Sequence, residues 1–304
     1  MSLSVLIIVN PKAGTYSKGR LDTAIRTFKA AGYRVDIYFT SKTGDAGAKT
    51  KEAVAALNKE AYSMIVSAGG DGTINEVANG AAFSETPVSV LPFGTSSVLC
   101  KDLGIKDDIE VAVRKIISGT TYNVSLGTIK TMPAEQTSPP ITRYFVGMAG
   151  VGFDAEAVYG VNKGIKAYAG VGAYILSGIN CLLNLNSDKI KMAIDGDFIT
   201  CNTVIISNGT RYGGDINLAP RADVRSPVLY ATIFQYSDRL ELIAAVGEVL
   251  LGRHVLVKSR YARQIGFSSM KIEDSGFHVH VDGDYFGRTP IEVGSVENAL
   301  RLIY

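Results

Sequence analysis

Apolar runs alternate with amphipathic segments over the first 120 residues of the chain. Residues 3–9 are almost continuously apolar, which is typical of a strand that is buried on both faces. Further strands are predicted at Val35–Phe39, Met64–Ser67 and Val88–Leu91, with helices at Lys18–Ala31 and from Asp45 to about Lys59. Repeated strand–helix units predict an N-terminal α/β domain with a parallel sheet covered by helices on both sides.

The pattern changes after residue 123, where short alternating or β-branched runs are separated by turn residues. These runs are Val124–Lys130, Arg143–Met148, Lys189–Ile194, Thr203–Ser207, Val228–Phe234 and Phe277–Val281. They predict a C-terminal antiparallel β-sandwich. We therefore expect a first domain at residues 1–123, a second at 124–290, and a terminal segment, 291–304, that packs back on the first domain.

Composition narrows the class of protein. The chain has 304 residues, 46% hydrophobic and 20% charged, which is enough for packed cores, and its net charge of +2 gives no sign of a nucleic-acid partner. Three separated cysteines indicate free thiols in a cytoplasmic protein. Residues 164–185 are the one stretch that could suggest a membrane span, but Lys166 and several glycines favour a buried or surface-docked helix. Peripheral contact with a membrane and the oligomeric state are left open.

The segment S-A-G-G-D-G-T-I-N-E-V-A-N-G, residues 67–80, carries the strongest chemical signal. It joins an apolar strand to a glycine-rich turn and then to a segment with helical periodicity. Gly69, Gly70 and Gly72 let a ligand approach the backbone closely. Unpaired backbone N–H groups at a helix N-terminus bind phosphate well, so the segment predicts a nucleotide-phosphate site.

Three loops follow predicted strands of the first domain and should converge on one sheet edge. They are residues 10–14, 69–73 and 92–97, and Thr40 lies on the same rim. Taken singly, each loop could be an ordinary turn, with Asp71 as a local cap. The P-loop motif is absent, and Asn75 stands where a Rossmann motif would have its third glycine.

These motifs resemble those of the diacylglycerol kinase and sphingosine kinase superfamily, of the bacterial lipid kinase type. The matching segments, in family order, are Asn10-Pro11 to Gly14, Gly69 to Thr73, Asn75-Glu76-Val77, Leu91 to Thr95, Gly150 to Ala155, Tyr212-Gly213-Gly214, Ala219 to Ala222 and Val281 to Asp284. The resemblance implies an ATP-binding α/β domain, a β-sandwich that helps to hold a lipid, and transfer of the ATP γ-phosphoryl group to a lipid hydroxyl with Mg²⁺. The implied ATP contacts are Asn10, Pro11, Lys12, Ala13, Gly14, Thr40, Gly69, Gly70, Asp71, Gly72, Thr73 and Thr95. Asp71 would act through magnesium or water, and the sequence assigns no metal ligands.

The same resemblance implies a general base at Asp284, the last residue of Asp282-Gly283-Asp284. Family members usually have Glu there, and the shorter Asp still offers a carboxylate to accept the hydroxyl proton. The alternative is a plain Asp-Gly hairpin with Asp284 as a turn residue.

Two further positions depart from the family pattern. Arg225-Ser226-Pro227 stands where many relatives have an acidic pair, so we expect no structural magnesium there. Ser97 replaces a frequent Asn and could cap the helix that follows it.

The leading hypothesis is a lipid kinase acting on a lipid substrate at a membrane surface. The alternatives are a kinase of a soluble substrate, such as an NAD kinase, and a nucleotide-binding regulator with little or no catalysis. The sequence does not specify the lipid.

Overall fold

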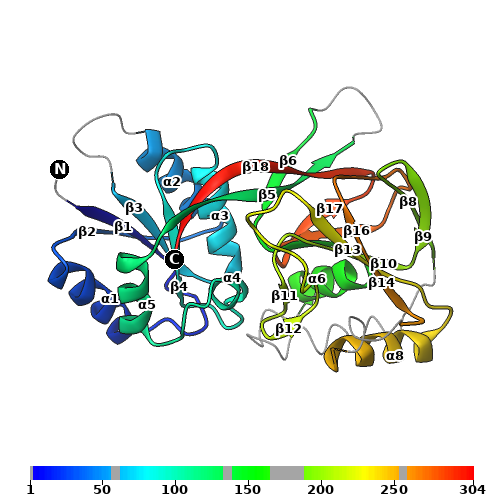
Figure 1. Cartoon of the computed structure of the whole chain (residues 1–304), viewed down its shortest axis with the longest axis horizontal. Coiled ribbons are helices and arrows are strands. Elements are labelled where there is room, and N and C mark those ends of the chain that lie inside the picture. Colours follow the sequence, from blue (N-terminus) through cyan, green and yellow to red (C-terminus); the bar gives the residue numbers. More distant parts are fainter. Residues whose placement is uncertain (1–2, 56–61, 133–138, 165–187, 253–258) are drawn as a thin grey trace. The chain divides into compact units, whose positions relative to one another are not determined.

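The computed structural model describes residues 3–55, 62–132, 139–164, 188–252 and 259–304 (Figure 1). It consists of two compact units, Met1–Leu126 with Glu297–Tyr304, and Gly127–Val296. The chain passes between the units within two long strands, β5 (Thr121–Thr131) and β18 (Ile291–Ile303). Each unit is described by itself.

The first unit is an α/β fold around a parallel sheet with strand order β2-β1-β3-β4. Its strands are β1 (Ser4–Val9), β2 (Arg34–Phe39), β3 (Met64–Gly69) and β4 (Val88–Pro92). Every residue of β1, β3 and β4 is buried, as their apolar runs predict. The end of β18 runs parallel to β4, with Leu302 opposite Val88.

Helices cover the sheet of the first unit in two pairs, α1 with α5 and α2 with α3 (Figure 1). The helices are α1 (Lys18–Ala30), α2 (Asp45–Ala55), α3 (Asp71–Ala81), α4 (Val98–Asp102) and α5 (Ile109–Ser118). Helices α2 and α3 approach closely because both carry glycine at the contact: a Cβ on Gly80 would lie 2.7 Å from the Gly47 carbonyl oxygen. The part of the predicted second helix beyond Ala55 lies outside the described residues.

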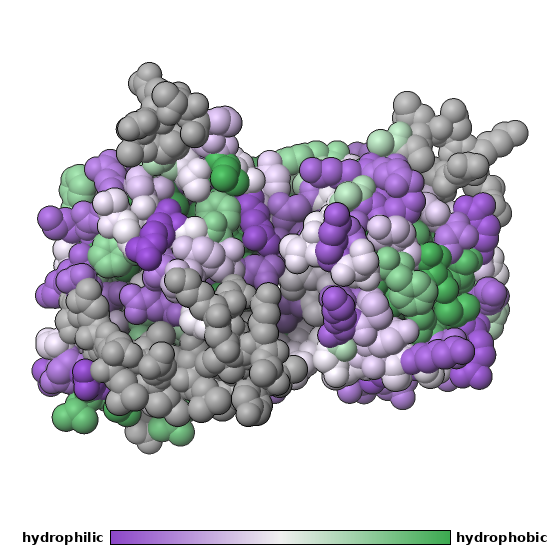
Figure 2. All heavy atoms as spheres, turned by 180° about the vertical axis from the view of Figure 1, so that it is seen from behind, coloured by the Kyte–Doolittle hydropathy of each residue, from purple (hydrophilic) through white to green (hydrophobic). Residues whose placement is uncertain are grey.

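The edge strand β2 is less covered than its neighbours. Ile37 and Phe39 are exposed, and Figure 2 shows apolar side chains gathered on the outer side of this unit. Asp45 is the first residue of α2, as predicted, but its carboxylate binds residues that precede the helix. Its carboxylate accepts hydrogen bonds from the backbone N–H groups of Ser41 (2.8 Å) and Lys42 (3.0 Å), so it stabilises the loop before the helix.

The second unit is an antiparallel β-sandwich, and the prediction of fold class is confirmed for both units. One sheet has the order β14-β13-β10-β7-β16-β17, and the other contains β9, β8, β15, the start of β18, β5 and β6. The strands are β6 (Thr142–Phe145), β7 (Met148–Gly152), β8 (Ile190–Ile194), β9 (Asp197–Cys201), β10 (Thr203–Ser207), β11 (Arg211–Tyr212), β12 (Ile216–Asn217), β13 (Leu229–Phe234), β14 (Ala262–Phe267), β15 (Ser269–Ile272), β16 (His278–Val281) and β17 (Asp284–Arg288). The apolar faces of the two sheets form one core.

Two helices belong to the second unit, α6 (Phe153–Gly164) and α8 (Arg239–Leu250). Helix α6 packs on β7, β16, β17 and β10. The apolar stretch at residues 164–185 falls almost wholly outside the described residues. No helix in the described part of the chain is long and apolar enough to cross a bilayer.

The prediction of a single strand at Arg143–Met148 is wrong. Strand β6 ends at Phe145 and β7 begins at Met148, with a bend between them. The bend forms because the Asp282 carboxylate accepts hydrogen bonds from three successive backbone N–H groups, those of residues 146–148, at 2.8–3.0 Å. In one continuous strand, those N–H groups would instead hydrogen-bond to a neighbouring strand of the sheet.

Candidate functional site

The first predicted loop begins at Asn10, directly after β1. The Asn10 side chain accepts a hydrogen bond from the Lys12 backbone N–H (2.9 Å) and donates one to the Thr73 hydroxyl (3.2 Å). Its own backbone N–H donates to the Ala68 carbonyl oxygen of β3 (3.0 Å). Asn10 therefore shapes its own loop as an Asx turn and ties it to the second loop.

The second loop joins β3 to α3 within two residues. Gly70 precedes α3 in extended conformation and offers no side-chain cap. The first-turn N–H groups of α3 are therefore left without a capping side chain, which is the arrangement that binds anions. Gly69 is required because a Cβ there would lie 2.5 Å from the buried Thr73 side chain.

The third loop contacts both of the others. A Cβ on Gly94 would lie 2.7 Å from the Gly70 Cα, so these two loops meet backbone to backbone. A Cβ on Gly14 would collide with the Thr95 hydroxyl. The structure thus brings the three loops of the first unit together at the N-terminus of α3.

Asp71 and Ser97 show how the third loop is held. The Asp71 carboxylate accepts a hydrogen bond from the Val98 backbone N–H (2.9 Å), so it caps α4 rather than its own helix. The Ser97 hydroxyl donates to the Gly94 carbonyl oxygen (2.8 Å) and makes no cap hydrogen bond. The predicted role of Ser97 as a helix cap is wrong, because Asp71 fills that place from 27 residues away.

Thr40 lies at the same sheet edge, since its backbone N–H donates to the Val9 carbonyl oxygen (2.8 Å) at the end of β1. The loop after it is fixed by Glu76 of α3. The Glu76 carboxylate accepts hydrogen bonds from the backbone N–H groups of Gly44 (2.8 Å) and Ala46 (3.1 Å). Our sequence reasoning quoted Glu76 as part of a motif but did not foresee this role. Its place one turn after the glycine-rich segment was the available signal.

Arg20 of α1 is a second residue that sequence reasoning missed. Its guanidinium donates to the Pro92 carbonyl oxygen (2.7 Å), pairs with Asp107 (2.7 Å) and lies over the Phe93 ring, 5.6 Å from its centroid. Arg20 therefore supports the start of the third loop. Nothing local in the sequence indicates this contact, which joins residues 72 positions apart.

The proposed base, Asp284, is the first residue of β17 and not a turn residue. The turn itself is Asp282-Gly283, both with positive φ (47° and 81°), and Val281 pairs with Asp284 across it. The Asp284 side chain is 48% exposed, and its carboxylate lies 3.2 Å from the Arg143 guanidinium. The hairpin alternative was thus right about the turn and wrong about the place of Asp284.

Arg225, which the resemblance to the family places at the expected acidic pair, forms an ion pair with Asp223. Its Nε and Nη2 atoms donate to the two carboxylate oxygens at 3.0 and 2.7 Å. The hydrogen bonds from Arg225 hold the pKa of Asp223 below its usual value. The prediction that no structural magnesium binds here remains a prediction.

The residues of the first unit fit a nucleotide polyphosphate. The fit rests on the uncapped N-terminus of α3 and on glycines at each point where a Cβ would intrude. Magnesium is usually held by one or two carboxylates together with substrate phosphates, and Asp71 supplies a half-buried carboxylate at this place. Within the described ranges no group of three or more His, Cys, Asp or Glu side chains could hold a metal by itself.

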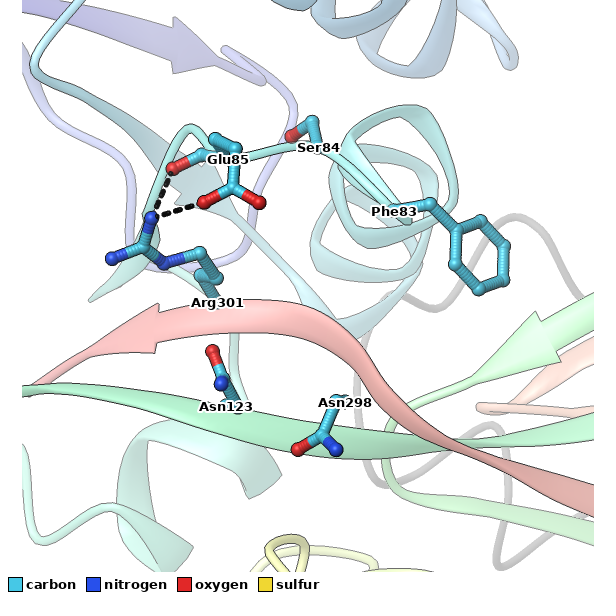
Figure 3. A pocket seen from close by; sticks show the side chains of 6 residues that line it. All are labelled: Phe83, Ser84, Glu85, Asn123, Asn298 and Arg301. Carbon is cyan, nitrogen blue, oxygen red and sulfur yellow. Dashed lines mark hydrogen bonds and ion pairs between the residues drawn. The ribbon is translucent and has the colours of Figure 1, made fainter.

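A separate pocket of about 490 Å³ in the first unit contains none of the predicted site residues (Figure 3). It is lined by Phe83, Ser84, Glu85, Asn123, Asn298 and Arg301. The Arg301 guanidinium is already bound by Glu85, through the carboxylate (2.7 Å) and the backbone carbonyl (3.0 Å). We assign no role to this pocket.

Comparison with known proteins identifies the family. Residues 4–129 match the diacylglycerol kinase catalytic domain, and residues 147–304 match the YegS C-terminal NAD kinase beta sandwich-like domain. A diacylglycerol kinase from Staphylococcus aureus (strain bovine RF122 / ET3-1) is 30% identical over 303 residues, which are 96% of this chain and 89% of that protein. The chain belongs to the diacylglycerol kinase family.

Further comparisons show the same similarity in sequence and in fold. The diacylglycerol kinase of Bacillus subtilis (strain 168) is 29% identical over 294 residues, covering 94% of this chain and 91% of that one. A solved diacylglycerol kinase from Bacillus anthracis str. Sterne shares the fold, with a TM-score of 0.70 at 18% identity over 99% of this chain and 96% of that one. A yeast NADH kinase is a more distant fold relative, with a TM-score of 0.52 at 11% identity over 100% of this chain and 84% of that one. Family membership supports a lipid kinase.

Proposed function

We propose that the protein is an ATP-dependent lipid kinase that transfers the γ-phosphoryl group of ATP to a lipid hydroxyl. The observation that carries the proposal is the junction of three loops at the uncapped N-terminus of α3 in the first unit. Such a junction presents backbone N–H groups and small side chains to a polyphosphate, and phosphoryl transfer depends mainly on positioning and charge stabilisation.

In this proposal the backbone of Gly70 to Thr73 binds phosphate oxygens, and residues 10–14, Thr40 and Thr95 complete the nucleotide contacts. Asp71 acts on the metal side. Magnesium would neutralise charge on the transferred phosphate. Asn10, Glu76 and Arg20 act indirectly by holding the loops in place.

Asp284 is the proposed general base. Of the two carboxylates in the turn segment, Asp282 is engaged by three backbone N–H groups, so Asp284 is the better candidate to accept a proton. The lipid hydroxyl would give its proton to Asp284 while its oxygen bonds to the γ-phosphorus. The bond from that phosphorus to the β–γ bridging oxygen breaks, and ADP leaves. Before the proton is transferred, the Arg143 guanidinium would hold the Asp284 carboxylate in place.

The activity is tested by incubating the full-length protein with labelled ATP, Mg²⁺ and a total lipid extract in vesicles. Mass spectrometry of the products should show a phosphorylated lipid. Asp284→Asn should lower the rate by on the order of 100-fold or more while ATP affinity stays unchanged, because a general base typically contributes about 10²–10⁴-fold.

Asp197→Asn is the matched control. Asp197 is also the last residue of an Asp-Gly-Asp hairpin and the first residue of a strand, but it is exposed on the β8–β9 hairpin. The Asp197→Asn variant should phosphorylate the lipid at the wild-type rate. ATP binding without transfer to any lipid would favour the nucleotide-binding regulator, and transfer only to a soluble acceptor such as NAD would favour the other alternative.

We also propose that the substrate is met at a membrane surface by a cytoplasmic protein. This proposal is supported by the lipid acceptor that membership of the family implies, because lipids of that class reside in bilayers. Co-sedimentation tests this part separately. The fraction of protein that sediments with vesicles containing the lipid substrate is compared with the fraction that sediments with vesicles lacking it.

A further inference from the structure

A buried acid–base pair in the second unit has no place in the reaction described above. Asp154 of α6 and His280 of β16 form an ion pair between Asp154 Oδ2 and His280 Nε2. The other carboxylate oxygen of Asp154 accepts a hydrogen bond from the Tyr212 hydroxyl. The His280 side chain is only 2% exposed and that of Asp154 only 10%. Buried charges are costly unless paired, so the pairing is a specific feature of this fold.

Two glycines of β7 make room for the Asp154–His280 pair. A Cβ on Gly150 would collide with His280 Nε2 and would lie 2.5 Å from the Asp154 carboxylate. Gly152 has φ of 97°, a conformation that suits glycine, and it turns the chain from β7 into α6. Asp154 then falls in the first turn of α6, where a negative charge is favoured. The segment Gly150 to Ala155 is one of those on which the family resemblance rests. Its glycines leave room for the pair and turn the chain so that Asp154 reaches His280.

Each partner of the pair favours the charged form of the other. Burial by itself would lower the pKa of His280, but the Asp154 carboxylate outweighs burial and raises that pKa above its usual value. Burial would likewise raise the pKa of Asp154, yet His280 and Tyr212 hold it below its usual value. Among the described residues, His280 Nδ1 has no hydrogen-bond partner, so Asp154 is the single anchor of the ring.

His280 connects α6 to the hairpin that carries Asp284. In the sheet it lies opposite Gly150 of β7 and Tyr285 of β17, beside an irregularity in the β16–β17 register. The charged or titratable groups around it are Asp154 on α6, Tyr212 on β11, and Asp282 and Asp284 in the hairpin. The Asp154 carboxylate and the His280 imidazole therefore join helix α6 to a short strand and to the hairpin.

We propose that Asp154, His280 and Tyr212 are positioning residues, whose buried contacts fix the Asp282–Asp284 hairpin that carries the base. This inference rests on the proposed function for its kinetic part. The geometric part, a hairpin held by the ion pair, is independent of any activity.

Two substitutions test the proposal in the full chain. His280→Gln keeps an amide that can donate to Asp154 but removes the positive charge, and Asp154→Asn removes the negative one. Each should increase hydrogen–deuterium exchange at the backbone amides of residues 282–285. Each should also lower kcat by on the order of 10-fold, as expected for a displaced catalytic group, with KM for ATP changed by less than about 2-fold. His278→Gln is the control, since His278 lies two residues earlier on the same strand, stacks on Tyr159 of α6 and contacts Tyr285 and Arg288. It therefore removes a histidine that links α6 to the hairpin without touching the pair of Asp154 and His280.

The split between kcat and KM separates positioning from a merely structural role. In His280→Gln the loss should fall on kcat and leave KM for ATP near its wild-type value, because a displaced base slows the chemical step without changing nucleotide binding. Both parameters should stay near their wild-type values in His278→Gln. Tyr212→Phe removes the hydroxyl that donates to Asp154 and serves if the other variants fail to fold; it should give the same changes, smaller in size.

Unchanged exchange at residues 282–285 in folded variants would overturn the proposal, and so would a wild-type kcat in His280→Gln. If the wild-type protein phosphorylates no lipid, the proposed function fails. The exchange experiment then still decides whether the ion pair holds the hairpin.

Discussion

At the scale of single residues, the chain contains two Asp-Gly-Asp segments that share one backbone conformation. Asp195 and Asp282 both have left-handed φ, at 48° and 47°, and each is followed by a glycine with positive φ. Their carboxylates do different work. Asp282 accepts three backbone hydrogen bonds from the bend before β7, whereas the exposed Asp195 accepts hydrogen bonds from Ser268 and Ser269.

Asp282→Asn should therefore destabilise the second unit, while Asp195→Asn should have a smaller effect. Asparagine tolerates the left-handed conformation, so each substitution tests the carboxylate rather than the turn. We expect Asp282→Asn to lower the free energy of unfolding by about 1–3 kcal/mol, the range for a buried hydrogen-bonding group left unsatisfied. Denaturant unfolding followed by far-UV circular dichroism measures this. Equal losses in the two variants would contradict the role assigned to Asp282.

At the scale of elements, carboxylates fasten neighbouring elements through backbone N–H groups or charges. In the first unit, Asp71 of α3 caps α4 and Glu76 of the same helix binds the start of α2. In the second unit, Asp154 fastens α6 to β16. Helix α3 therefore organises two of its neighbours while its own N-terminus stays without a side-chain cap.

The attachment of α6 to β16 should depend on pH. The pKa of His280 is raised above 6.5 in the fold, so its stabilisation is complete below about pH 6.5 and is lost as pH rises through the folded pKa. The pKa of Asp154 is lowered below 3.8, so its stabilisation is present above about pH 4 and is lost as pH falls through the folded pKa. The pair contributes most between these limits.

Denaturant unfolding of wild type and His280→Gln at pH 6 and pH 9 checks this expectation. The difference in free energy of unfolding between the two proteins should be larger at pH 6. A difference of the same size at both pH values would show that the pair is not ionised in the way described.

At the scale of the whole molecule, the two units divide the proposed work. The proposed nucleotide contacts all lie in the first unit and the proposed base lies in the second. ATP with Mg²⁺ should therefore slow backbone hydrogen exchange at residues 10–14 and 69–73, because ligand binding to the folded state suppresses local opening. The hairpin at residues 195–197 should not respond and serves as an internal control. ATP binding confirmed by calorimetry, without protection at residues 10–14 and 69–73, would contradict the assignment of the site.

The sequence by itself determined the two fold classes, most of the strands, and the three loops that meet in the first unit. These features are local: a buried strand shows as an apolar run, and a strand–turn–helix junction shows as glycines before a periodic segment. Parallel strands place such loops at one edge whatever the details of packing, so their convergence could be predicted.

Tertiary structure alone decided which partner each of these carboxylates meets. Asp71 with Val98, Arg143 with Asp284, and Asp154 with His280 join residues 27, 141 and 126 positions apart. Such pairings depend on strand register and on which face a side chain occupies, and a shift of one residue along a strand reverses the face. The sequence could therefore name Asp282-Gly283-Asp284 as a candidate segment. Only the fold showed that Asp282 holds the bend and leaves Asp284 as the carboxylate for the proposed chemistry.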